Sequence, residues 1–97
     1  MKDSTLGGYL REHERPPAFR GSDGDAFTVE IIVDEAPAGA GAWAAYLFFV
    51  RWRGGEAVGH LETDYLSEAG SPEGARAPIE ALTLHEVKNI LDGLLAR

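Results

Sequence analysis

The sequence predicts an α+β fold, in which an antiparallel β-meander of three to four strands carries one C-terminal helix across one face. Three features support this fold: an alternating apolar segment at residues 26–35, a Gly54-Gly55 pair between two further strand-like segments, and an amphipathic segment at the C-terminus. Packing the apolar side of the helix on the apolar side of the sheet gives two layers, the minimal way to bury both.

The domain organisation follows from the length and from the irregular start of the chain. At 97 residues the chain has the size of one domain. We assign residues 18–97 to a single α+β domain and residues 1–17 to an irregular N-terminal arm. "GG" and "PP" bracket "YLREHER" in this arm, and its few apolar residues suit one short helical turn at most.

Two strands are expected next. "AFRGSDGDAF" is typical of a tight hairpin, because Gly24 after Asp23 accepts positive φ, and a short strand at residues 18–20 can pair with the following one. In "AFTVEIIVDE" four apolar residues alternate with Thr28, Glu30, Ile32 and Asp34, which predicts a strand with one apolar side. The residues on that side are Phe27, Val29, Ile31 and Val33.

The apolar segment "WAAYLFFVRWR", residues 43–53, predicts a central strand. Gly54-Gly55 predicts a two-residue turn into a strand at residues 56–66. Residues 67–81 contain two glycines and two prolines, which favours a long loop in which Ser71-Pro72 could cap a brief helical turn.

The C-terminal helix has an explicit start signal. Thr83 and Glu86 form a T-x-x-E capping box, and Leu82 with Val87 suits a hydrophobic staple. The apolar residues then follow the spacing of one helical face. They are Leu84, Val87, Ile90, Leu91, Leu94 and Leu95.

The Gly54-Gly55 turn also predicts which side chains share a face. In a two-residue hairpin Arg53 lies opposite Glu56, and the pairing runs outward from there. Trp52, Val50, Phe48 and Tyr46 then face the core with Leu61 and Tyr65. The other side of the sheet receives a mixed apolar and charged set: Trp43, Ala45, Leu47, Phe49, Arg51, Arg53, Val58, His60, Glu62, Asp64 and Leu66.

This second face suggests the leading functional hypothesis, a small non-enzymatic protein-interaction module. Uncovered faces that mix aromatic residues with arginine are typical of interfaces. The expected partner is a second copy of the chain, giving a homodimer, or another protein; alternatively, the N-terminal arm covers the face. The candidate contact residues are Trp43, Leu47, Phe49, Arg51, Arg53, His60 and Glu62.

The alternating residues of "GHLETDYL" raise a second possibility, a ligand site. His60, Glu62 and Asp64 lie on one side of a strand, but neighbours at i and i+2 stand about 7 Å apart, so they form a line and not a metal cage. We therefore expect a polar strand face, without a metal or a cofactor.

The alternative function is a protein that binds a small anion or metabolite, or a minor enzyme, with a pocket around Arg51, His60 and Glu62. Against a ligand role for the arginines, Arg51 can pair with Glu30 and Arg53 with Glu56. The sequence has no nucleophile motif, so no catalytic residue is assigned.

The charge and hydropathy of the chain narrow its partners. The net charge of −7 repels phosphate backbones, so nucleic acid is not an expected partner. The longest apolar run has nine residues, too few to cross a bilayer as a helix. With no cysteine, disulfides and thiolate metal sites are excluded. A cytoplasmic protein without membrane partners is expected.

Overall fold

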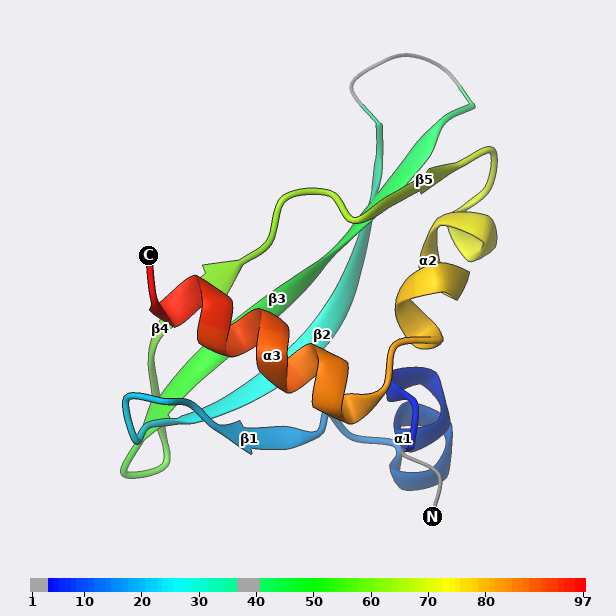
Figure 1. Cartoon of the computed structure of the whole chain (residues 1–97). Helices are drawn as coiled ribbons and strands as arrows, with labels where there is room; N and C mark the ends of the chain where they lie inside the picture. Colours follow the sequence, from blue (N-terminus) through cyan, green and yellow to red (C-terminus); the bar gives the residue numbers. More distant parts are fainter. Residues whose placement is uncertain (1–3, 37–40) are drawn as a thin grey trace.

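The computed structural model describes residues 4–36 and 41–97. It has an α+β architecture, with an antiparallel sheet and, in this described part, three helices (Figure 1). The α+β class is confirmed, whereas the expected single helix is not. The elements in chain order are α1 (Leu6–His13), β1 (Ala18–Arg20), β2 (Ala26–Glu35), β3 (Trp43–Arg53), β4 (Glu56–Glu62), β5 (Ser67–Ala69), α2 (Pro72–Glu80) and α3 (Leu84–Leu95).

The sheet has the order β1-β2-β3-β4, and β5 pairs with the beginning of β3 beyond the end of β4. Every described pairing is antiparallel. The expected Gly54-Gly55 turn is present: φ is 56° at Gly54 and 82° at Gly55, a conformation that glycine adopts without strain.

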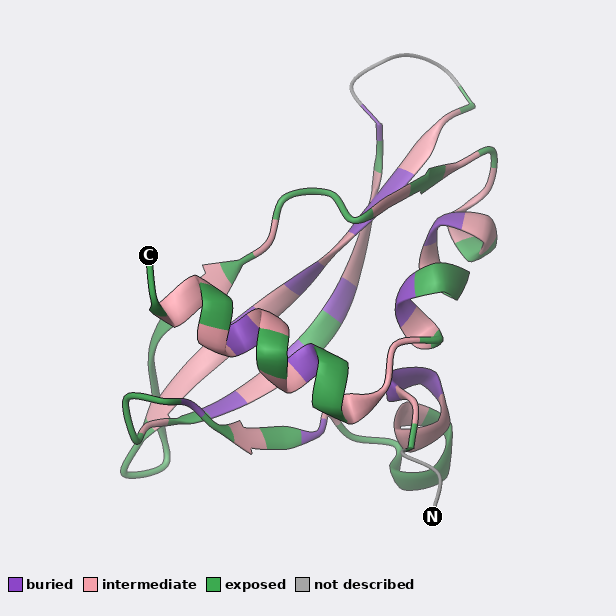
Figure 2. Ribbon diagram, viewed as in Figure 1, coloured by how far each residue is buried: buried purple, intermediate pink, exposed green. Residues whose placement is uncertain are grey.

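All three helices contribute to one core on one side of the sheet. In Figures 1 and 2, α3 crosses β2 and β3, and most of the buried residues lie on these strands and on the helices. Phe27, Val29 and Ile31 of β2 are buried in this core and Val33 packs against it, as predicted. The members of the buried cluster are Leu6, Phe27, Val29, Ile31, Ala45, Leu47, Phe49, Ala75, Ile79, Val87 and Leu91.

The predicted facing of β3 is wrong, and a register shift explains why. Beside the turn, Trp52 pairs with Ala57 as expected, but the next pair is Arg51 with Gly59, so Val58 is an extra residue. Such a bulge reverses the relation between the two strands. Leu61 still faces the core, but its partner is Phe49. The Gly54-Gly55 turn therefore predicts only the two residue pairs beside it, Arg53 with Glu56 and Trp52 with Ala57.

The predicted loop at residues 67–81 is also wrong, because it contains β5 and α2. The suggested cap at Ser71 is present: its side chain accepts a hydrogen bond from the Gly74 N–H, and Pro72 occupies the first helical turn. Ala75 and Ile79 are buried. Burial of this small apolar face offsets the weak helix propensity that glycine and proline give the segment.

The N-terminal arm forms a helix that joins the core, where only a short turn was expected. Leu6 is fully buried. The Leu6 N–H donates to the Leu82 carbonyl at 2.8 Å, and the Leu84 N–H donates to the Ser4 carbonyl at 2.9 Å. The described part of the arm is thereby fixed beside the start of α3, on the core side of the sheet.

The C-terminal helix α3 is confirmed together with its start signal. The Thr83 hydroxyl accepts from the Glu86 N–H at 3.0 Å, and the Glu86 carboxylate accepts from the Thr83 N–H at 2.9 Å. Val87 and Leu91 are buried against the sheet. Near the other end of α3, Asp92 accepts from the Ser22 N–H, which ties the helix to the β1–β2 turn.

Candidate interaction face

The side of the sheet that points away from the helices forms a continuous surface, which we call the open face. It carries even-numbered residues of β2 and β3 and two residues of β4, and its large apolar side chains are only partly buried. Its residues are Thr28, Glu30, Ile32, Asp34, Tyr46, Phe48, Val50, Trp52, His60 and Glu62.

The middle of the open face is formed by aromatic side chains of β3, which we call the aromatic row: Tyr46, Phe48 and Trp52. The ring of Phe48 stacks on His60 with a centroid distance of 5.0 Å. The indole Nε1–H of Trp52 donates to the Thr28 hydroxyl at 2.9 Å. These contacts orient both aromatic rings while leaving part of their apolar area in water, as is typical of surfaces that bind other proteins.

The chain between β4 and β5 leaves the β-ladder and builds a pocket at one end of the open face. Phe48 pairs with Glu62, and Ala45 pairs with Ser67. Three positions along β3 therefore correspond to five positions along the facing chain. Thr63 closes the gap in the ladder: its N–H donates to the Leu47 carbonyl, and its hydroxyl accepts from the Leu47 N–H. The two additional residues allow Tyr65 to turn onto the open face.

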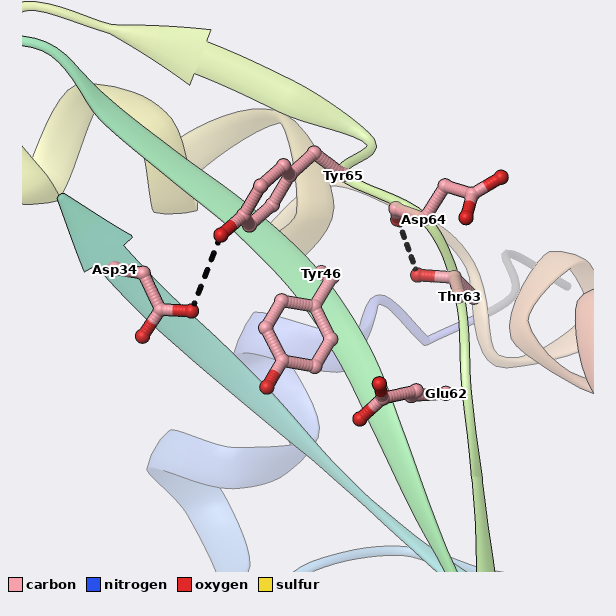
Figure 3. A pocket seen from close by; sticks show the side chains of 6 residues that line it. All are labelled: Asp34, Tyr46, Glu62, Thr63, Asp64 and Tyr65. Atoms are coloured by element: carbon pink, nitrogen blue, oxygen red, sulfur yellow. Dashed lines mark hydrogen bonds between the residues drawn. The ribbon is translucent and has the colours of Figure 1, made fainter. Parts of the chain in front are cut away.

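The pocket has a volume of about 410 Å³ and is open to solvent. The rings of Tyr46 and Tyr65 meet edge to face at 5.8 Å, and the Tyr65 hydroxyl donates to Asp34 at 3.4 Å across β3 (Figure 3). The residues that line it are Asp34, Tyr46, Glu62, Thr63, Asp64 and Tyr65.

The pocket has a negative electrostatic environment. Its three carboxylates form no ion pair within residues 4–36 and 41–97. Loss of water raises the pKa of Tyr46, and the charges of Glu62 and Asp34 raise it further. The pKa of Tyr65 is raised for the same reasons, desolvation first and Asp34 next. The site therefore disfavours additional negative charge and favours positive charge.

The apolar candidates from the sequence lie elsewhere. Leu47 and Phe49 are fully buried in the core, and Trp43 packs against the same core, so the structure does not place them on an exposed face. The register shift at Val58 is the physical reason, because it exchanges the two sides of β3 relative to β4. His60 and Glu62 do lie on the open face, as expected.

The two arginine candidates form ion pairs on the core side. Arg51 lies over the ring of Phe27, 4.8 Å from its centroid, and pairs with Asp23 and Asp25. Arg53 pairs with Asp25 at 2.9 Å. The predicted ion pairs, Arg51 with Glu30 and Arg53 with Glu56, are therefore wrong. Arg51 is also separated by the sheet from His60 and Glu62, so the predicted pocket around these three residues is not assembled.

The charges around Asp25 shift its proton equilibrium. Hydrogen bonds from Arg53, and then from Arg51, lower the pKa of Asp25 from 3.8 to about 2. The pKa of Asp23 is lowered by the Asp25 N–H and by Arg51. This cluster ties the β1–β2 turn to the end of β3, which is a structural role.

Sequence reasoning missed Tyr46, Tyr65 and Asp34 as site residues. Both tyrosines were assigned to the core by the uninterrupted register. One available signal was the phenol itself, since a tyrosine ring tends to lie where its hydroxyl can reach water or an acceptor.

The described part of the chain has a second, smaller pocket of about 290 Å³, where the segment after α1 meets Glu30 and Arg76. Within this described part of the chain, no three His, Cys, Asp or Glu side chains gather closely enough to hold a metal ion. None of the described helices is long and apolar enough to cross a membrane. Comparison of the chain with protein-family models, curated proteins and solved structures finds no match.

Proposed function

We propose that this chain is a small protein-interaction module that docks a basic protein partner on its open face. The observation that carries the proposal is the composition of this face: a partly exposed aromatic row on β3 flanked by carboxylates. The open-face positions of β2, β3 and β4 carry no lysine or arginine, whereas the edge strand β1 places Arg20 on the same side of the sheet and Arg15 lies near Glu30.

The size of the open face is adequate for a stable complex. Strands β2 and β3 pair over ten positions. With a rise of about 3.4 Å per residue and a strand spacing of about 4.8 Å, the four strands cover roughly 500 Å² in projection. The accessible area of such a surface exceeds its projection, so it approaches the roughly 600–1,000 Å² that each partner contributes to a standard interface.

Charge favours a basic partner over a second copy. In a face-to-face homodimer, the carboxylates of Glu30, Asp34 and Glu62 would approach those of the other copy across a partly dehydrated interface. Like charges placed together in this way cost free energy, whereas a basic surface gains attraction and a faster association rate. The homodimer expected from the sequence thus becomes the competing proposal, and sedimentation velocity distinguishes the two.

A peptide-display selection against the whole immobilised chain tests the proposal. We expect the selected peptides to be enriched in arginine and lysine beside apolar residues, and to lose binding to a Phe48→Ser variant. His85→Ser is the matched control, because His85 is exposed on α3, and it should bind normally. Circular dichroism establishes that both variants fold.

Neutral or acidic selected peptides would contradict the proposal, as would peptides that bind wild type and Phe48→Ser equally. A wild-type chain that sediments as a dimer, and a Phe48→Ser variant that sediments as a monomer, would instead support the homodimer.

A further inference from the structure

We infer that the pocket lined by Tyr46 and Tyr65 binds the guanidinium group of an arginine side chain presented by the docking partner. This inference rests on the proposed function and deepens it, because it assigns one anchoring contact at one end of the open face.

The pocket has the size and the walls for such a group. Its volume of about 410 Å³ falls within the roughly 300–1,000 Å³ of small-ligand sites. Tyr46 and Tyr65 contribute aromatic surface from two different segments, β3 and the β4–β5 connection (Figure 3). A cation within about 6 Å of a tyrosine ring is attracted to the ring face, and guanidinium also stacks on it.

The carboxylates lie where they can complete the recognition. Asp34 comes from β2 and Glu62 from the end of β4, so these two carboxylates border the aromatic surface from different sides, whereas the Asp64 carboxylate points away from the rings (Figure 3). A planar guanidinium presents five N–H donors and can bind more than one carboxylate oxygen at once. A lysine ammonium would satisfy the charge, but it offers neither the planar fork nor the stacking surface.

The cavity is held in shape by its own contacts. The Tyr65 hydroxyl is directed to Asp34, and Thr63 bonds Leu47 through both its N–H and its hydroxyl. The Thr63 hydrogen bonds anchor the β4–β5 connection to the main chain of β3. Part of the pocket is therefore preorganised before a ligand arrives, which reduces the entropy lost on binding.

The position of the pocket fits an anchor within a larger interface. Tyr46 belongs to both the pocket and the aromatic row, and Phe48 follows it on the same side of β3. A partner arginine in the pocket would therefore place the neighbouring partner residues over Phe48 and Val50. Interfaces commonly concentrate their binding energy in such an arginine and in the aromatic residues around it.

A two-dimensional NMR titration of the full chain with N-acetyl-arginine amide tests the site directly. We expect saturable shifts of the amides around Tyr46, Thr63 and Tyr65, with weak affinity because the probe is small. N-acetyl-lysine amide should bind several-fold more weakly, and the norleucine analogue should produce no saturable shift. The Asp34→Asn, Glu62→Gln double variant should lower the affinity about tenfold, because charge-assisted hydrogen bonds are lost.

The control is Glu73→Gln, which removes a negative charge from an exposed position on α2, on the core side of the sheet, and should leave the affinity unchanged. Equal binding of arginine and norleucine probes would overturn the inference, as would an unchanged affinity in the double variant that still folds.

The failure of this inference is distinguishable from failure of the proposed function. If basic peptides bind the open face, need Phe48 and ignore the double substitution, the docking proposal stands and the arginine pocket is refuted. If the arginine probe binds the pocket while no basic peptide requires Phe48, the pocket stands as a site for a small guanidinium compound, and the docking proposal is refuted.

Discussion

Asp25 is the residue whose surroundings have the clearest measurable consequence. Its carboxylate accepts from Arg53 and from Arg51, and both bonds favour the charged form. In the unfolded chain the pKa returns to about 3.8. The stabilisation from this group is therefore complete above the unfolded pKa, and it is lost as the pH falls from about 3.8 towards 2.

Replacing Arg53 with glutamine should raise the pKa of Asp25 from about 2 towards 3.8, because Arg53 supplies the largest of the shifts that lower it. A carboxyl NMR titration measures this pKa. Arg20→Gln is the control, since Arg20 bonds the Gly24 carbonyl at 2.7 Å and should leave the pKa of Asp25 near its native value. An unchanged pKa in Arg53→Gln would contradict the observed ion pair.

Among the elements, β1 to β4 and the capped helix α3 could be predicted from the sequence because their signals are local, whereas β5 was predicted as part of a loop. Alternation identified β2, the two glycines identified the β3–β4 turn, and Thr83 with Glu86 identified the start of α3. The bulge at Val58 has no comparable local signal. A single extra residue in β4 determines which side of β3 is buried, so the whole site prediction depended on it.

The helix α2 was missed for a related reason. Gly74 and Pro78 lower the local helix propensity, whereas the compensating burial of Ala75 and Ile79 exists only once the core has formed. The pocket likewise arises from the interrupted pairing between β4 and β5, which brings Tyr65 to Asp34 from 31 positions away in the chain. Contacts of this range could not be predicted from local patterns.

Two glycines on helices give a matched test of how the elements pack. A Cβ at Gly7 would lie 2.7 Å from the Glu80 Cβ, because α1 approaches α2 closely there. Gly7→Ala should therefore lower the free energy of unfolding by about 1–3 kcal/mol. A Cβ at Gly93 on α3 would meet no atom within 4 Å, so Gly93→Ala should raise the free energy of unfolding by about 0.5–1 kcal/mol.

Chemical denaturation of the two variants measures both changes. If Gly7→Ala were as stable as the wild type, α1 would not be packed on α2 as described, and the N-terminal segment would be a loosely attached arm.

At the scale of the whole molecule, the sheet separates two surfaces with different roles. The helices and the Asp23–Arg51–Asp25 contacts lie on the core side. The opposite side retains partly exposed aromatic rings and carboxylates without a described helix over them. The net charge of −7 adds a long-range attraction for basic partners, which salt would screen over about 8 Å at physiological ionic strength.

An amide perturbation map of the full chain with the tightest-binding basic peptide from the selection locates the docking surface. We expect changes concentrated on β2, β3, β4 and the Thr63–Tyr65 connection, with an affinity that falls as salt is added. Changes concentrated on α1, α2 or α3, or an affinity indifferent to salt, would contradict the assignment of the open face as the docking surface.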